Sequence, residues 1–134
     1  MIRSAFLGLF LIAAGSAPAT AQDLDCSDTS NLPQQAMNLC ALKDFEAEDR
    51  KLNDAWKDVF GELKARDAEL DETFRGMPAA LLNAQRSWIT FRDAHCETEG
   101  FKYRGGSIEP LIYHSCRAAL TQERIRQIKS LLEE

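Results

Sequence analysis

The clearest pattern in the chain is a run of apolar positions spaced three and four residues apart. This spacing predicts an amphipathic helix that starts near Pro33, where proline suits the first helical turn. Only one member of the run, Asp49, is polar. The run comprises Leu42, Phe45, Asp49, Leu52, Trp56, Val59 and Leu63. The charged residues 66–74 that follow are still compatible with a helix.

A second helix is predicted from about Pro78 to Glu99, after a break at Gly76–Pro78. Its apolar face includes two polar side chains, which need partners if they are buried. Two interpretations of Arg92 remain open. It is either buried with a counter-ion, or it lies at the edge of the face and reaches into water. The face comprises Leu81, Gln85, Trp88, Arg92 and His95.

The C-terminal part predicts a loop over Gly100–Gly106, then a helix from about Ser107 to Leu120 with Ser107 as its N-cap. Thr121 is expected to cap a final turn-rich stretch that ends near Leu132. No segment alternates apolar and polar residues as a strand does. The sequence therefore predicts an all-α domain, built on an antiparallel hairpin of two long helices plus C-terminal helices.

The N-terminus has the pattern of a secretory signal peptide covering residues 1–21. Arg3 precedes an apolar run over Ala5–Ala14, and Ala19-Thr20-Ala21 forms an A-x-A cleavage site. An N-terminal membrane anchor is the alternative, but a bilayer needs about 20 apolar residues. The residue before Cys26 is acidic, unlike a lipoprotein signal. We expect a periplasmic or secreted domain over residues 22–134 without a stable membrane anchor.

The four cysteines all lie in the expected mature chain, and an even number in an oxidising compartment suggests two disulfides. We favour Cys26–Cys40 and Cys96–Cys116, which close short loops and would contribute roughly 3 kcal/mol each. A zinc site is the competing interpretation, because His95 and His114 lie beside cysteines. No short pair of ligands typical of zinc supports it.

Composition and motifs argue against several function classes. The net charge is −5, and loss of Arg3 with the signal peptide would make it more negative, which disfavours nucleic acid. Acidic residues are numerous, but no pair has a recognisable glycosidase pattern, and a small helical domain offers little concavity. No phosphate loop, dinucleotide fingerprint or haem motif is present. We expect neither an enzyme nor a bound cofactor or metal.

Four ordered segments resemble the LprI-like family, small exported helical domains named for a lysozyme-inhibiting lipoprotein. The central signature is the most extensive, and the pieces together span most of the mature chain. They are Met37-Asn38-Leu39-Cys40-Ala41, Asp49-x-x-Leu52-Asn53, Ala84-Gln85-Arg86-x-Trp88-x-x-Phe91-Arg92-Asp93-x-x-Cys96, and Gly105-Gly106-Ser107 followed by Cys116 and Thr121-x-x-Arg124.

The resemblance implies binding and inhibition of lysozyme or a related wall-degrading hydrolase. A periplasmic interaction or accessory module without a lysozyme target is the alternative. Two features depart from the family. The namesake is lipid-anchored whereas this chain lacks that signal, and the stretch between Leu63 and Pro78 is longer than usual.

The long stretch leaves two registers for the hairpin. A tight turn at Gly76–Pro78 places Arg92 opposite Gly61 and Glu62. If the extra residues bulge out instead, Asp49 faces Arg92, so neither charge is buried alone. We favour the second register. Its expected structural network comprises Asp49, Asn53, Gln85, Trp88, Arg92 and Asp93.

A partner is expected to contact the loop Gly100–Gly106 and its flanks. Aromatic and arginine side chains are typical interface anchors, and a loop tied by a disulfide is already ordered before binding. The alternative is that the aromatic residues of the loop fold back and pack onto the helices. A basic target would instead favour acidic flanks. The candidates are Phe101, Tyr103 and Arg104 in the loop and Glu97, Glu99 and Glu109 beside it.

Overall fold

The computed structural model describes residues 24–133, which form three helices and no strand. Helix α1 spans Gln34–Glu69, α2 spans Met77–Phe101, and α3 spans Glu109–Lys129. Short 3-10 segments cover Glu72–Phe74 and Ser130–Leu132. The all-α prediction is confirmed. The expected signal peptide over residues 1–21 lies outside the described residues, and within them no helix is long and apolar enough to cross a membrane.

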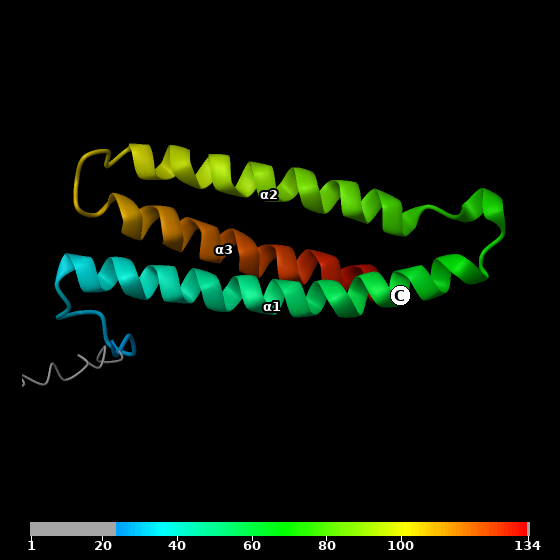
Figure 1. Cartoon of the computed structure of the whole chain (residues 1–134), viewed down its shortest axis with the longest axis horizontal. Helices are drawn as coiled ribbons and strands as arrows, with labels where there is room; N and C mark the ends of the chain where they lie inside the picture. The colour runs from blue at the N-terminus through cyan, green and yellow to red at the C-terminus, as the bar shows by residue number, and fades with distance from the viewer. Residues whose placement is uncertain (1–23, 134) are drawn as a thin grey trace, which may run out of the picture.

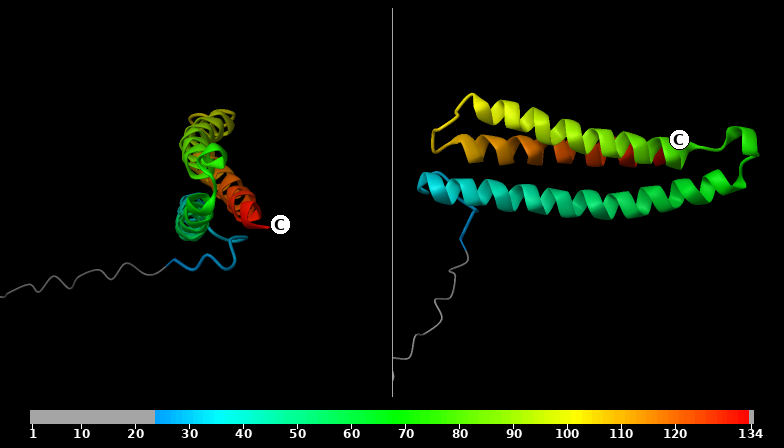
Figure 2. Two further views of the ribbon diagram at one scale, coloured as in Figure 1. Left: turned by 90° about the vertical axis from the view of Figure 1, so that its right-hand side faces the viewer. Right: turned by 45° about the horizontal axis from the view of Figure 1, so that its top comes forward.

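The three helices lie side by side as an elongated bundle (Figure 1). Helix α2 runs antiparallel to α1, and α3 reverses again, so α1 and α3 run in the same direction. Viewed from its end in Figure 2, the bundle is triangular. The largest interface is between α1 and α3, and direct contact between α1 and α2 is smaller. Helix α3 therefore completes the packing of the α1–α2 hairpin.

The apolar core follows the predicted face of α1. Its buried members are Leu52, Ala55, Val59, Leu63, Leu81 and Ile128, with Trp56, Phe60, Trp88, Ile125 and Leu132 packed around them. Burying a Leu, Val or Ile side chain stabilises the fold by about 1.5–3 kcal/mol. The core therefore depends on all three helices, since α2 contributes Leu81 and α3 contributes Ile128.

Three local predictions were wrong. Thr121 does not cap a helix but lies fully buried inside the continuous helix α3. Ser107 is not the N-cap, because residues 103–108 form turns and α3 begins at Glu109. His95 is exposed, and the buried face of α2 continues through Cys96 and Gly100 instead. Packing against neighbouring helices selected these positions over local residue preference.

The extra residues between Leu63 and Pro78 extend α1 by more than a turn and then form a turn outside the α1–α3 interface (Figure 1). Two side chains fasten this turn. Asp67 Oδ1 accepts hydrogen bonds from the N–H groups of Gly76 and Met77, at 2.8 and 3.2 Å. Arg75 donates to the carbonyls of Leu70 and Ala68. Unpaired groups at the end of α1 and the start of α2 are thereby satisfied.

Candidate functional site

A charged network around Arg92 joins the three helices in the middle of the bundle. The Arg92 side chain is only 5% exposed. Its Nη1 donates to Asp49 Oδ1 at 3.0 Å and its Nε donates to Asp93 Oδ1 at 2.9 Å. The chain has the second of the two registers, because Asp49 on α1 and not Glu62 faces Arg92. Two carboxylates compensate a guanidinium that would be costly to bury alone.

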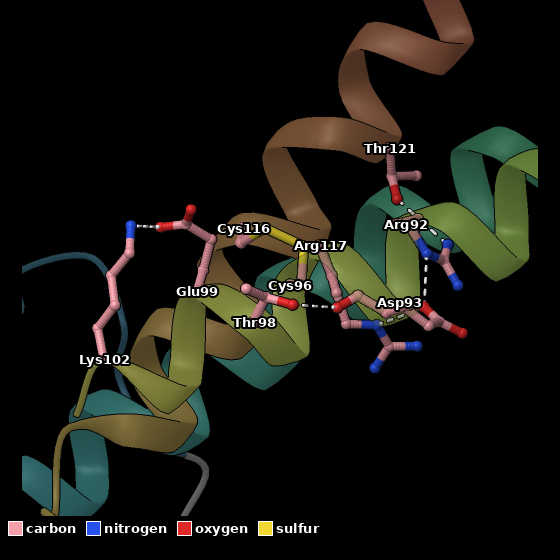
Figure 3. Close-up of a disulfide and its surroundings, with 10 residues drawn as sticks. Arg92, Asp93, Cys96, Thr98, Glu99, Lys102, Cys116, Arg117 and Thr121 are labelled. Carbon is pink, nitrogen blue, oxygen red and sulfur yellow. Dashed lines mark hydrogen bonds and ion pairs between the residues drawn. A yellow bond between two sulfur atoms is a disulfide. The ribbon is translucent and has the colours of Figure 1, made fainter. Parts of the chain in front are cut away.

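Helix α3 supplies further partners to this network (Figure 3). Thr121 Oγ1 accepts a hydrogen bond from Arg92 Nη1 at 3.3 Å, which explains why a threonine is buried there. Arg117 Nε donates to Asp93 Oδ1 at 3.1 Å. The Arg92 guanidinium also lies 5.0 Å from the centre of the Phe45 ring. Arginine over an aromatic face is attracted by the ring quadrupole, more strongly where water is excluded.

The other expected members occupy the edges of the network. Gln85 Oε1 accepts a hydrogen bond from Arg124 Nε at 2.9 Å, and Trp88 lies beside the guanidinium groups of Arg92 and Arg124. Asn53 is exposed and makes a long contact of 3.4 Å with Asp49 Oδ2. The network holds the helices in register, since Arg92 and Arg117 are paired with carboxylates and Arg124 donates hydrogen bonds to two glutamine side chains.

Sequence reasoning missed four members of the network: Phe45, Arg117, Thr121 and Arg124. Arg117, Thr121 and Arg124 recur at steps of four and three, so the period of a helix places them on one face. That signal was present in the sequence. It was obscured by the expectation that a helix ended before Thr121.

The loop end of the bundle is fastened by the two disulfides, and the pairing predicted from sequence is confirmed. Cys96–Cys116 joins α2 to α3 (Figure 3). Cys26–Cys40 ties the N-terminal segment to α1. The cysteine sulfurs are thus bonded to each other, and no group of three or more His, Cys, Asp or Glu residues in the described part of the chain is arranged to hold a metal ion.

The connection between α2 and α3 is a series of hydrogen-bonded turns. Gly105 has a φ of 81°, a conformation that favours glycine. Its N–H donates to Glu109 Oε2 at 3.0 Å, so a side chain from the start of α3 fixes the middle of the connection. Because Cys96–Cys116 closes the base of the same hairpin, the connection is held at both ends.

The candidate contact residues of this connection are substantially exposed. Phe101 and Tyr103 are 44% and 46% exposed. The Arg104 guanidinium lies 4.2 Å from the centre of the Phe101 ring. Lys102 Nζ lies 2.7 Å from Glu99 Oε2, and this hydrogen bond lowers the pKa of Glu99. Both aromatic side chains therefore reach solvent, and the Arg104 side chain packs over the Phe101 ring.

A cavity of about 450 Å³ opens between the last turn of α2 and the first turns of α3. Two of the three predicted acidic residues, Glu97 and Glu109, line it, whereas Glu99 does not. Its other lining residues are Gly100, Phe101, Pro110, Tyr113 and His114. The cavity is therefore aromatic and acidic at once.

His114 is the one imidazole that lines the cavity. Its ring stacks against Phe45 and meets Tyr113 edge-on, and its Nδ1 is buried without a hydrogen-bond partner among the described residues. Burial lowers the pKa of His114, the charge of Arg117 lowers this pKa further, and Glu46 opposes the shift. The neutral imidazole is thus favoured. The cavity lining contains no serine, threonine or cysteine that could act as a nucleophile beside it.

Comparison with known proteins gives a family and one well-matched relative. The model of the lysozyme inhibitor LprI family matches residues 26–128, which include both disulfides and the whole Arg92 network. An uncharacterized protein of Rhizobium meliloti (strain 1021) is 38% identical, over 98% of this chain and 97% of the relative. No solved structure matches the chain.

Proposed function

This chain belongs to the lysozyme inhibitor LprI family, and from that premise we propose that it is an exported protein that binds lysozyme or a related wall-degrading hydrolase and inhibits it. It inhibits the enzyme by binding to it and does not itself catalyse a reaction. The single observation that carries the proposal is the family match over most of the chain, which includes the disulfide-bonded hairpin.

The proposed contact surface is the connection between α2 and α3 with its flanks. A hairpin closed by Cys96–Cys116 presents Phe101 and Tyr103 already ordered, which lowers the entropy cost of binding. Large exposed aromatic side chains are frequent binding anchors. The net charge of −5 favours association with a basic partner, because opposite charges raise the rate of encounter.

Export is part of the proposal. Two disulfides are typical of proteins in oxidising compartments, and the sequence of residues 1–21 has the features of a cleaved signal peptide. We expect the protein isolated from the cell envelope or medium to begin at Gln22. Its intact mass measures this directly, and a mass that retains residues 1–21 or a lipid would contradict cleavage at that site.

The test of function is the lysis of a cell-wall suspension by chicken-type and goose-type lysozymes with increasing amounts of the purified exported protein. We expect inhibition by the parent protein and weaker inhibition by the Phe101→Ala/Tyr103→Ala variant. Phe74→Ala is the matched control, because Phe74 is 73% exposed at the opposite end of the bundle. Circular dichroism establishes that each variant is folded.

Two outcomes would revise the proposal. Inhibition that survives the double aromatic substitution would move the contact surface away from this connection. An absence of inhibition at large molar excess would favour the second candidate, an envelope interaction module with a different target. The exposed, disulfide-ordered hairpin suits that role equally, because its geometry does not specify the partner.

A further inference from the structure

The cavity between α2 and α3 has the features of a binding site for a positively charged side chain. Helix α2 contributes Glu97, Gly100 and Phe101, and α3 contributes Glu109 and Tyr113. The Gly100 backbone faces α3, since a Cβ atom placed on it would be in ordinary contact with Tyr113 Cβ at 3.6 Å. The packing of the two helices here brings one carboxylate from each to the cavity.

The carboxylates of the cavity are incompletely used by the protein itself. Glu97 makes no ion pair or hydrogen bond with residues 24–133. Glu109 accepts one hydrogen bond, from Gly105 N–H to Oε2, and its second oxygen accepts none from the described chain. An exposed carboxylate without a partner is hydrated at little cost. Two carboxylates beside an apolar wall nevertheless create a local negative potential.

None of the neighbouring cations lines the cavity, although Arg104 and Arg117 lie near two of its aromatic rings. Lys102 pairs with Glu99, Arg104 lies over Phe101, and Arg117 pairs with Asp93. Burial and the charge of Arg117 lower the pKa of His114, so its imidazole adds no positive charge near neutral pH. The groups that line the cavity therefore carry two negative charges and no compensating positive one.

The aromatic walls select among cations. Phe101 and Tyr113 both already lie near guanidinium groups of this protein, Arg104 at 4.2 Å and Arg117 at 5.1 Å from the ring centres. A guanidinium is planar, stacks on aromatic rings and pairs with carboxylates through two parallel hydrogen bonds, whereas an ammonium is a compact and strongly hydrated charge. A bare metal ion would gain little from aromatic walls and only two carboxylates.

We propose that this cavity binds an arginine side chain of a protein partner, with Glu97 and Glu109 holding the guanidinium and Phe101 and Tyr113 flanking it. The identification of that partner as a lysozyme rests on the proposed function, and the binding of an arginine side chain does not. The proposal keeps Glu97 and Glu109 as residues that recognise the partner. It leaves out the third acidic candidate, Glu99, because the carboxylate of Glu99 is already paired with Lys102.

The direct test is a nuclear magnetic resonance titration of the purified exported protein with Nα-acetyl-arginine amide, which mimics an arginine within a chain. Nα-acetyl-citrulline amide is the neutral analogue of the same shape. We expect saturable shifts of the Gly100 amide and the Tyr113 ring with the arginine derivative, and little change with citrulline. A titration with free arginine distinguishes a site for the amino acid itself from a site for an arginine side chain within a protein. Tighter binding of free arginine would overturn the protein-partner assignment.

The matched variants are Glu97→Gln and Glu72→Gln, which change net charge equally, one in the cavity and one at the opposite end of the bundle. We expect Glu97→Gln to weaken binding of the arginine derivative by about tenfold, equivalent to about 1.4 kcal/mol. Glu72→Gln should leave binding unchanged. Glu109→Gln provides a second cavity variant, and unchanged binding in both cavity variants would overturn the proposal.

The same variants in the lysis assay separate this proposal from the proposed function. Inhibition of lysozyme with no saturable shift by the arginine derivative would overturn the cavity proposal and leave the inhibitor function standing. Arginine binding that depends on Glu97, in a protein that inhibits no lysozyme, would support the cavity and overturn the identification of its partner. If Glu97→Gln loses both arginine binding and lysozyme inhibition while Glu72→Gln keeps both, the cavity proposal and the proposed function are both supported.

Discussion

Asp49 on α1 and Arg92 on α2 lie 3.0 Å apart, although 43 residues separate them in the chain. The two partners differ in environment, because the Arg92 side chain is 5% exposed and that of Asp49 is 40% exposed. Arg92 also retains Asp93 as a second counter-ion. The pair is therefore a buried cation held by carboxylates at the edge of the bundle, not a fully buried ion pair.

The first prediction concerns this asymmetry. Arg92→Ala should lower the free energy of unfolding by about 3–5 kcal/mol, because it leaves a cavity and removes the common partner of two carboxylates. Asp49→Ala should cost less, about 1–2 kcal/mol, since the guanidinium keeps Asp93 and Thr121.

Urea denaturation measures both losses, with Glu62→Ala as the control. Glu62 pairs with Arg66 on the exposed surface of α1, and such pairs contribute about 0.3–0.5 kcal/mol. Equal losses for Asp49→Ala and Arg92→Ala would mean that Asp93 does not serve as a second counter-ion.

The second prediction separates the two disulfides. Replacing Cys96 and Cys116 by alanine should lower the free energy of unfolding by roughly 3 kcal/mol, since this bond joins two core helices. Replacing Cys26 and Cys40 should cost less. The N-terminal segment that they fasten is mostly exposed, so it can detach and regain entropy while the bundle stays folded. Thermal unfolding followed by circular dichroism ranks the variants, and the reverse order would place the N-terminal segment in the stable core.

The third prediction uses two glycines of opposite effect. Gly76 has a φ of 135°, so Gly76→Ala should destabilise the protein by about 1 kcal/mol or more. Gly61 lies within α1, and a Cβ there meets nothing within 4 Å. Gly61→Ala should therefore stabilise the protein by about 0.5–1 kcal/mol, because alanine is the better helix former. Opposite shifts in melting temperature are the expected result, and a gain in stability from Gly76→Ala would contradict the turn geometry.

The fourth prediction follows from His114. Burial lowers the pKa of this imidazole below its ordinary value of 6.5, so the unfolded chain binds more protons than the folded one as the pH falls through that region. The free energy of unfolding should therefore decrease between about pH 7.5 and pH 5.5, before most carboxylates titrate. The charged groups that affect the pKa of His114 are Arg117 and Glu46, and Glu97 and Glu109 face it across the cavity.

His114→Phe should reduce this pH dependence without loss of stability at neutral pH, because the buried Nδ1 makes no hydrogen bond within the described chain and a phenyl ring fits the stack on Phe45. His95→Gln is the control, since His95 is exposed on the outer face of α2. Denaturant titrations at the two pH values measure the effect. The prediction would be wrong if the pH dependence disappeared in His95→Gln and persisted in His114→Phe, because His95 would then be its source.

The sequence by itself determined the features that depend on local periodicity and covalent chemistry. Apolar residues at helical spacing specified α1 and α2, and their polar members Asp49 and Arg92 marked where the helices meet. The two short separations among the four cysteines favoured the disulfide pairing that the structure has. These features follow from residue order because a helix repeats every 3.6 residues whatever lies beside it.

Only the tertiary structure decided the position of α3 and the surroundings of each buried polar group. Thr121 has the local signature of a cap, yet a hydrogen bond from Arg92 favours it inside a helix. Glu97 and Glu109 lie on different helices, and they share a cavity because α2 and α3 pack side by side, with Gly100 facing Tyr113. Such contacts depend on how helices pack and exclude water, and residues distant in the chain determine both.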